Sequence, residues 1–211
     1  MSNVHLTTRR AFAGGLVGAA LVAGSRALGQ SGMLPTPESS MGPFYPISHP
    51  AEDDADMVRL RGHSRQAQGQ VIQVSGRLLD RHGNPIRNGR IDVWQANAAG
   101  RYDHPQDIST APLDPDFQGF ARLRTGANGE WRITTIRPSG YNSPIGNRPP
   151  HIHFDAAGRS HRLVAQMYFP EEATGNAADR LYQSLGSDAA RSVAALDAPG
   201  RYRWDIVLIE G

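Results

Sequence analysis

Short apolar segments separated by turn signals constrain the fold of this chain more than any other feature of its sequence. From residue 71 onward, stretches rich in Val, Ile, Leu, Phe and Trp alternate with clusters of Gly, Asn, Asp and Pro. Several of these stretches alternate apolar and polar side chains, a period typical of half-buried strands. The run Ala127-Asn128-Gly129 is a strong hairpin signal. We expect strands at residues 71–79, 90–96, 120–125, 131–136, 151–155, 163–169 and 204–209.

This spacing predicts an all-β domain, more specifically an antiparallel β-sandwich. Residues 177–185 and 189–196 have the composition of short helices in the C-terminal half. Residues 98–119 and 138–150 form connections that are longer than a compact sandwich requires, and such loops are usually functional or disordered. Both connections contain tyrosines, and the second runs directly into two histidines. The two connections are therefore candidates for functional loops.

Residues 1–29 have the pattern of an export signal. Arg9 and Arg10 precede an apolar stretch rich in Gly and Ala, and small residues follow it near Ala27. The stretch is shorter than the ~20 residues that span a bilayer, and the arginine pair resembles a twin-arginine signal. We expect export to the periplasm and no membrane segment in the mature form. An ordinary secretory signal and an uncleaved anchor remain alternatives.

Residues 30–70 are expected to form an extended N-terminal arm in front of a β-sandwich catalytic domain at residues 71–211. The arm is rich in Pro, Gly, Ser and charged residues and shows no sustained period. Its one apolar group is Gly42-Pro43-Phe44-Tyr45-Pro46.

Composition excludes several kinds of site. The sequence has no cysteine, so disulfides, zinc–thiolate sites, iron–sulfur clusters and cysteine nucleophiles are excluded. It has no lysine, so no lysine acts as a Schiff base or general base. The formal charge is +2, but Arg9, Arg10 and Arg26 leave with the signal, and the mature chain is close to neutral. Such a chain gives no electrostatic reason to expect nucleic-acid binding.

The sharpest local pattern is His151-Ile152-His153. In a strand, residues two apart point to the same face, with their backbones about 6–7 Å apart. That spacing suits two imidazoles that converge on one metal ion. Asp155 is a poor third ligand, because a further step along the strand would lengthen the row instead of closing a ring around the ion.

The two long connections offer Tyr102 and Tyr141 as further ligands. A neutral tyrosine binds metals poorly, because its reference pKa is about 10, and only a strongly Lewis-acidic, hard cation such as Fe(III) ionises it at neutral pH. From the residues alone, a zinc or copper site built on the histidines stays open.

Four stretches, taken in order, resemble the intradiol ring-cleavage dioxygenases and are closest to subunits of protocatechuate 3,4-dioxygenase. They are residues 90–102 (RIDVWQANAAGRY), 137–141 (RPSGY), 148–154 (RPPHIHF) and 166–170 (QMYFP). The GPFYP run at residues 42–46 is similar to the N-terminal stretch of that family. The resemblance covers roughly residues 40–211.

The resemblance implies a non-haem, high-spin Fe(III) held by four side chains. Tyr102 and His151 would be equatorial ligands, and Tyr141 and His153 axial ligands. It also implies an aromatic diol and O2 as partners, and an oligomer of like or unlike subunits. Two further catalytic residues follow from it: Arg148 would stabilise negative charge on the substrate ring, and Gln166 would line the pocket beside it. In this scheme Tyr141 also accepts a substrate proton.

The chain departs from that family in the second loop. The interval from Tyr141 to His151 is shorter than in protocatechuate enzymes, and Asn147 precedes Arg148 where a tryptophan is more usual. The arm is too short for the helical N-terminal domain of catechol 1,2-dioxygenases, which favours the protocatechuate-like branch. A metal-free alternative also remains, because the strand–turn–strand pattern resembles prealbumin-like and carbohydrate-binding sandwich modules.

Overall fold

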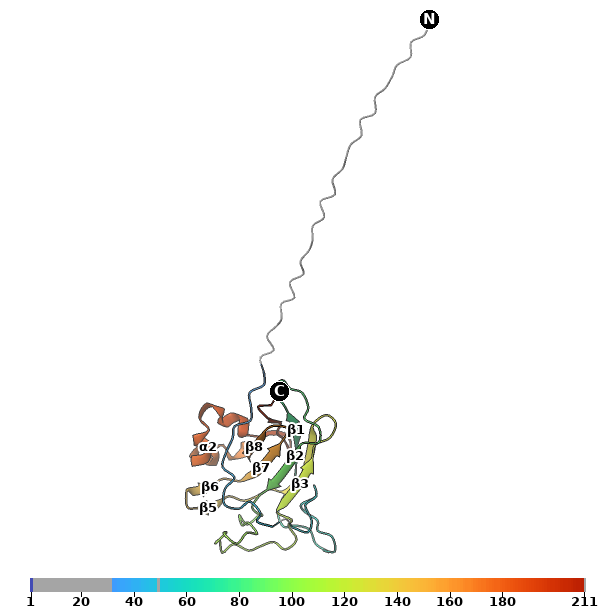
Figure 1. Ribbon diagram of the computed structural model, residues 1–211. Helices are drawn as coiled ribbons and strands as arrows, with labels where there is room; N and C mark the ends of the chain where they lie inside the picture. The colour runs from blue at the N-terminus through green and yellow to red at the C-terminus, as the bar shows by residue number, and fades with distance from the viewer. Residues whose placement is uncertain (2–31, 49, 211) are drawn as a thin grey trace. The chain divides into compact units, whose positions relative to one another are not determined.

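The computed structural model of the chain describes residue 1, residues 32–48 and residues 50–210, and its regular structure is mostly β-strand (Figure 1). The export signal expected at residues 1–29 falls, apart from Met1, outside the described residues and stays a prediction. No helix among the described residues has both the length and the apolar character needed to cross a membrane.

The first sheet is built around one long central strand. β1 (Val71–Leu79) pairs antiparallel with β4 (Glu130–Ile136) and parallel with both β10 (Arg201–Arg203) and β11 (Ile206–Val207). β9 (Ala195–Ala198) continues the sheet by pairing antiparallel with β10. The prediction of an entirely antiparallel fold is therefore wrong for this sheet. Its C-terminal segment runs along β1 in the same direction, and the expected strand at residues 204–209 is only the two residues of β11.

The parallel pairing depends on a close backbone approach at Gly76. The Trp204 amide donates to the carbonyl of Ser75 at 2.9 Å, and a Cβ on Gly76 would overlap the carbonyl oxygen of Trp204. A glycine at this position leaves room for the chain to pass close alongside β1 between β10 and β11.

The second sheet has four strands in the order β3-β2-β7-β8, and all of its pairs are antiparallel. Its members are β3 (Phe120–Arg124), β2 (Arg90–Trp94), β7 (His151–Ala157) and β8 (Arg162–Tyr168). A separate hairpin of β5 (Tyr141–Ser143) and β6 (Gly146–Arg148) lies within the second long connection. The sequence analysis did not predict this hairpin.

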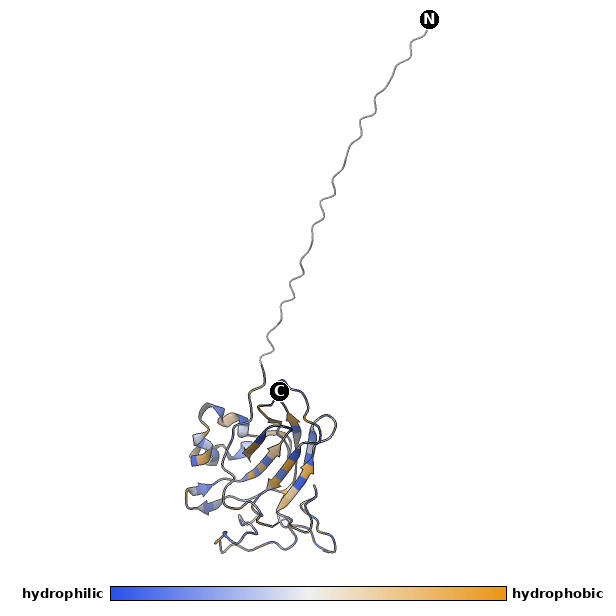
Figure 2. Cartoon of the chain, viewed as in Figure 1, coloured by the Kyte–Doolittle hydropathy of each residue, from blue (hydrophilic) through white to orange (hydrophobic). Residues whose placement is uncertain are grey.

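One hydrophobic core joins side chains of both main sheets. Val74 of β1, Ile133 of β4, and Ile152 and Phe154 of β7 belong to the same buried cluster. Strand residues alternate between this core and the outer face, and the alternation is visible along the strands of the second sheet (Figure 2). The predicted period of two therefore reflects which residues of a strand enter the apolar core, although the outer-face residues of β2 and β7 are also buried.

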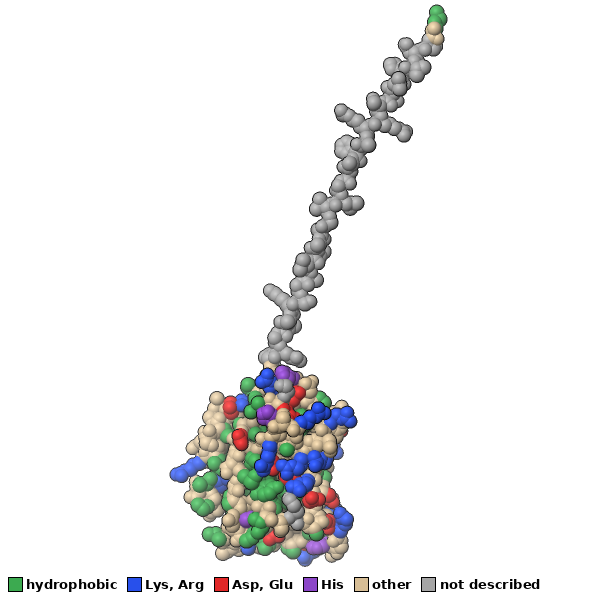
Figure 3. Space-filling model, in the orientation of Figure 1, with side chains coloured by type: hydrophobic (Ala, Val, Ile, Leu, Met, Phe, Trp, Pro, Cys, Tyr) green, Lys and Arg blue, Asp and Glu red, His purple; other side chains and the backbone are tan. Residues whose placement is uncertain are grey.

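The outer face of the second sheet carries buried charge. Asp92 and Asp155 are fully buried there, and each accepts hydrogen bonds from arginines. Arg122 donates to both oxygens of Asp92, Arg162 donates to both oxygens of Asp155, and Arg90 bridges the two aspartates. Basic side chains gather over this face in the space-filling view (Figure 3). Because a buried charge needs a partner, these ion pairs allow both aspartates to be buried on the outer face of the sheet.

The predicted arm packs against this domain. Ser39 donates its amide to Val164 of β8 at 2.8 Å, and Met57 donates its amide to Thr134 of β4 at 2.9 Å. Met57 is fully buried and belongs to the main core. The arm therefore has a second apolar anchor beyond the Gly42-to-Pro46 group.

The helices differ from their predictions. The helix expected at residues 177–185 is divided between α1 (Ala173–Ala178) and α2 (Arg180–Ser184). The prediction of a helix at residues 189–196 is wrong. The 3-10 helix η2 (Gly186–Ser192) occupies the first of these residues, and β9 occupies the last of them. Pairing with β10 draws the last of these residues into the first sheet. A further 3-10 turn, η1 (Pro170–Glu172), precedes α1.

Phe154 is the best single test of the joint between the sheets. Its ring contacts Trp131 of β4 and Trp204 beside β11, with centroids 5.3 and 5.1 Å apart. Phe154→Ala should lower the free energy of unfolding of the metal-free protein by about 3–5 kcal/mol, because it leaves a cavity in the core. Urea denaturation measures this loss. Ile209→Ala, which truncates an exposed side chain, should change it by less than about 0.5 kcal/mol, and equal losses for the two variants would contradict this account of the core.

Candidate metal centre

β7 brings His151 and His153 together on the outer face of the second sheet. Both side chains are almost completely buried, and their Nε2 atoms lie 3.2 Å apart. β7 is fixed on both sides, since His153 is paired with Trp94 of β2 and with Gln166 of β8. The two imidazoles therefore converge in the structure, as the sequence predicts.

Hydrogen bonding fixes the tautomer of His151. Its Nδ1 lies 2.7 Å from the carbonyl oxygen of Pro149, which only accepts, so Nδ1 carries the proton. The lone pair is therefore on Nε2, the atom that faces His153. The His153 ring stacks on Trp94, with centroids 4.8 Å apart and planes 13° apart, which holds that ring in orientation.

Burial keeps both imidazoles neutral. Burial first, and the nearby Arg148 guanidinium second, together lower the pKa of His151 to about 3. The pKa of His153 is also well below its usual value, through burial first and then through His151 and Arg148. Neutral imidazole is the form that binds a metal.

Tyr102 reaches the histidines from the first long connection. Its amide donates to Oδ2 of Asp107 at 2.7 Å, which fixes the loop at this residue. Its ring centroid lies 6.3 Å from that of His153. The hydroxyl is buried and makes no hydrogen bond of regular geometry among the described residues, although, after burial, the nearby Tyr141 side chain also raises its pKa. A buried hydroxyl without a regular hydrogen bond is costly, so its position needs an explanation.

Tyr141 reaches the same place through the β5–β6 hairpin. It pairs with Arg148 in that hairpin, and its ring lies 5.6 Å from His151 and 5.5 Å from Tyr102. The loops of the two tyrosines touch at Gly100, which has φ +78°, where a Cβ would lie 2.5 Å from the carbonyl oxygen of Gly140. The shortened second loop thus still delivers Tyr141, because it closes as a tight hairpin.

The four predicted ligands fit a hard, Lewis-acidic cation. Among the described residues, no group of three or more His, Asp or Glu is placed to hold a metal, so further ligands beside the two histidines must be of another kind. Burial raises the pKa of both Tyr102 and Tyr141. Both hydroxyls are therefore neutral without a cation, and the poorly hydrogen-bonded hydroxyl of Tyr102 is explained if it is a ligand. Asp155 lies further along β7 and is committed to its arginines.

Arg148 and Gln166 meet beside this group. Arg148 is buried at the end of β6, and its Nη2 donates to Oε1 of Gln166 at 2.5 Å. Sequence analysis missed two partners of the pair: Asp179, which accepts from the Arg148 Nε at 3.1 Å, and Tyr168, whose hydroxyl donates to Asp179 at 2.9 Å. An aspartate just before a short helix signals an N-cap, but nothing in the sequence connects it to Arg148.

The arm covers the group from the outside. Gly42, with φ +69°, lies so close to His153 that a Cβ would sit 3.4 Å from its Cε1 atom. The Phe44 ring stacks on Tyr102, with centroids 4.5 Å apart. Tyr45 donates its hydroxyl to Asp92 at 3.0 Å, and Gln166 donates to the carbonyl of Ser40 at 2.9 Å. These contacts keep water away from Tyr102 and His153.

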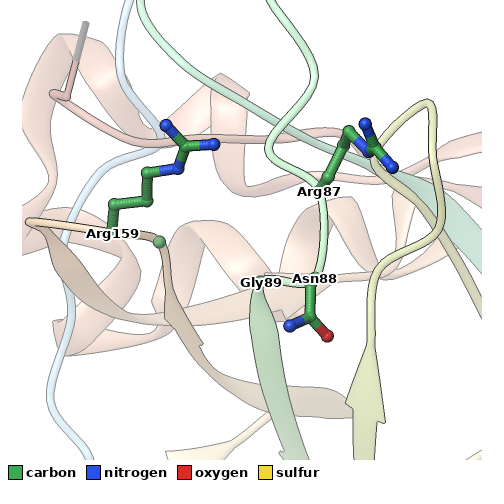
Figure 4. Close-up of a pocket in the computed structure, with 5 residues that line it drawn as sticks. Arg87, Asn88, Gly89 and Arg159 are labelled. Carbon is green, nitrogen blue, oxygen red and sulfur yellow. The ribbon is translucent and has the colours of Figure 1, made fainter.

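A surface hollow of about 370 Å³ lies elsewhere on the domain and contains none of these residues. It is lined by Arg87, Asn88, Gly89, Gly158 and Arg159 (Figure 4). These residues adjoin the paired ends Arg90 and Ala157, whereas the histidines lie at the opposite end of the β2–β7 pair. The hollow is therefore separate from the metal centre.

The neutral state of His151 predicts an acid sensitivity of the metal-free protein. The pKa in the folded state, about 3, lies below the unfolded value of about 6.5, so the unfolded chain alone gains a proton as the pH falls between these values. From pH 7 to pH 5 this costs about 2 kcal/mol of stability. Urea titrations of the wild type and His151→Gln should show that the variant loses less stability over this interval. His82→Gln removes an exposed histidine and should keep the wild-type slope, and identical slopes for all three proteins would refute the prediction.

Comparisons with known proteins identify the family of the chain. Residues 41–210 match the model of a family described as dioxygenase. The protocatechuate 3,4-dioxygenase beta chain of Burkholderia cepacia is 40% identical over 196 residues, which cover 83% of this chain and 81% of the relative. The alpha chain from Pseudomonas putida is 29% identical and covers 82% and 92%. The dioxygenase domain of a dioxygenase–carbohydrate-binding protein fusion from Streptomyces sp. SirexAA-E has a TM-score of 0.62 at 26% identity and covers 84% and 99%. The chain belongs to the intradiol ring-cleavage dioxygenase family.

Proposed function

We propose that this protein inserts both atoms of O2 into a catechol-type aromatic diol, with a protocatechuate-like compound as the substrate class. Cleavage of the ring bond between the two hydroxylated carbons gives a muconate-type diacid, which retains all atoms of the diol and both atoms of O2, so no external reductant is needed. One observation supports the proposal most strongly. The side chains of Tyr102, Tyr141, His151 and His153 lie close together, next to the buried Arg148. Membership of a dioxygenase family removes the alternative of a metal-free binding module.

The metal in this proposal is a non-haem Fe(III), the ion that this family uses. Tyr102, Tyr141, His151 and His153 would hold it. When bound, Fe(III) supplies the Lewis acidity that ionises the diol and the tyrosines, and the electron-accepting centre that makes the ring reactive toward O2.

Tyr141 is the proposed proton acceptor. Tyr141 is the more accessible of the two tyrosines, since it is only partly buried while Tyr102 is 4% exposed. Once ionised, Tyr141 Oη would receive a proton from the incoming diol, so that it acts as a general base as it gives way to the substrate. The Arg148 guanidinium lowers the pKa of Tyr141, against the larger effect of burial, and so helps its ionised form.

Arg148 is the proposed site of charge stabilisation. A guanidinium stays protonated at every physiological pH, and in a buried site its charge acts strongly on neighbouring groups. Beside His151 and Tyr141 it would stabilise negative charge that develops on the ring of the bound diol. Gln166 contacts Arg148 directly and would line the same pocket.

We also propose that the two main sheets form the predicted β-sandwich, which the shared core supports. The protein would act as an oligomer of like or unlike subunits. The support for this is that relatives carry the names alpha and beta chain.

Oxygen uptake tests the proposed reaction. Iron-loaded protein would be mixed with catechol, protocatechuate and hydroxyquinol in turn, and O2 consumption followed together with the appearance of the diacid. We expect uptake with at least one diol, in a ratio of one O2 to one diol. No uptake with any member of this panel would refute the proposed reaction.

Tyr102→Phe tests the tyrosine ligand. An Fe(III) bound by tyrosinate gives a visible charge-transfer band, so the variant should lose most of that band and most of its oxygen uptake. A zinc or copper site built on the histidines predicts instead that metal content stays intact. Tyr182→Phe is the matched control, because Tyr182 packs on Tyr168 and is not a proposed ligand. Its colour should equal that of the wild type.

The twin-arginine signal is proposed as the route to the periplasm, supported by the pattern of residues 1–29. Replacement of both Arg9 and Arg10 by Gln should keep the protein in the cytoplasm, because the receptor reads the arginine pair. Cell fractionation with an antibody measures this. An unchanged periplasmic fraction would favour an ordinary secretory signal instead.

A further inference from the structure

The guanidinium of Arg148 is held along one edge and free along the other. Its Nε lies 3.1 and 3.2 Å from the two carboxylate oxygens of Asp179. Its Nη2 lies 2.5 Å from Oε1 of Gln166 and 3.4 Å from the hydroxyl of Tyr168. No described residue accepts from Nη1. Since a guanidinium presents its donors in a rigid planar fork, fixing the Nε and Nη2 edge also fixes the direction in which Nη1 points.

The strand that carries Arg148 does not fix the side chain by itself. β6 has only three residues, and the first two, Gly146 and Asn147, are exposed. The backbone of β6 pairs only with the equally short strand β5. A long side chain on such a hairpin needs partners on other elements to keep one orientation.

Asp179 is well placed to be that partner. Its own side chain is fixed, because Oδ1 also accepts from the Leu181 amide as the N-cap of α2, and Oδ2 accepts from the Tyr168 hydroxyl at 2.9 Å. The side chains of both members of the ion pair are buried, with 4% of Arg148 and 1% of Asp179 exposed. α2 lies beside β6 and β8 in the ribbon view (Figure 1). Two separate segments, β8 and the N-cap of α2, therefore hold the Arg148 side chain.

We propose that Asp179 is a positioning residue for the ring-cleavage reaction: it holds Arg148 by its Nε edge so that Nη1 faces the substrate. The inference rests on the proposed function, in which Arg148 stabilises charge on the bound diol. Asp179 does not touch the substrate or the metal ligands in this role. It acts through Arg148, and it also supplies the negative charge that makes a buried guanidinium tolerable.

The first arm of the test needs no metal and no turnover. In ¹⁵N-labelled, metal-free protein, the Nε–H of Arg148 should give a slowly exchanging NMR signal, assigned by its disappearance in Arg148→Gln. Asp179→Asn keeps the size and the helix-capping ability of the residue but loses the charge, and it should shift this signal and speed its exchange. Asp188→Asn, which alters another aspartate–arginine pair, should leave it unchanged. An unaltered signal in Asp179→Asn would overturn the proposal.

The second arm measures turnover in the iron-loaded enzyme. Asp179→Asn should retain the iron content and the visible band but lower kcat/KM about 10–100-fold, the usual effect of losing a supporting contact, mostly through kcat. The thermal midpoint should fall, because the buried guanidinium loses its charged partner, so kcat/KM is measured at a temperature at which circular dichroism shows the variant to be folded. In an Arg148→Gln background, Asp179→Asn should cause little further loss, because both changes remove the same arrangement. Equal losses in the two backgrounds, or a kcat/KM within twofold of the wild type, would overturn the proposal.

The two arms separate this inference from the proposed function. If the wild type cleaves no diol, the proposed reaction fails, and the NMR signal alone decides whether Asp179 holds Arg148. If the wild type cleaves a diol and Asp179→Asn behaves like the wild type in both arms, the reaction stands and the positioning role is wrong.

Discussion

The pleat of β7 is the constraint on which the rest of the site depends. Its even-numbered residues Ile152, Phe154 and Ala156 lie in the core, so His151, His153 and Asp155 must all face outward. A shift of one residue would bury the histidines in the core and expose Phe154. Pairing with β2 and β8 on either side prevents that shift. The force that packs the core therefore also points the two imidazoles at each other.

The polar side chains on the outer face of the second sheet are unusual because they are buried, although they point away from the core. The arm covers Tyr102 and His153, Asp92 and Asp155 lie beneath arginines, and Arg148 is enclosed by Asp179, Gln166 and Tyr168. Burial keeps the histidines and tyrosines neutral, a state from which a strongly Lewis-acidic cation can recruit them as ligands. It also strengthens the field of Arg148, because few water molecules remain to screen it. The same covering thus prepares the metal ligands and the charge that would act on the substrate.

Much of the fold was readable from the sequence, and the errors have identifiable causes. The strand at residues 71–79 was predicted to the residue, because alternation of apolar and polar side chains is a local signal. The parallel pairing of β10 and β11 was missed, since it depends on where the C-terminal segment lies against β1 and on the close approach at Gly76. The end of the helix expected at residues 189–196 became part of β9, because pairing with β10 outweighs the local preference of so short a segment. The β5–β6 hairpin was not predicted, because the sequence pattern of its two short strands is too weak.

The sequence by itself determined which residues are available for chemistry. The spacing of His151 and His153 follows from a period of two, which is a local property, and the absence of cysteine limits the kinds of ligand. The roles of Tyr102, Tyr141 and Arg148 were implied by the resemblance of ordered motifs to a known family. Only the tertiary structure decided how these residues are supported. It showed that a shortened loop still delivers Tyr141, that the arm covers Tyr102, and that Asp179 holds Arg148. The contacts of the arm and of Asp179 join segments far apart in the chain, and their energies depend on burial and on distances that no local pattern of residues encodes.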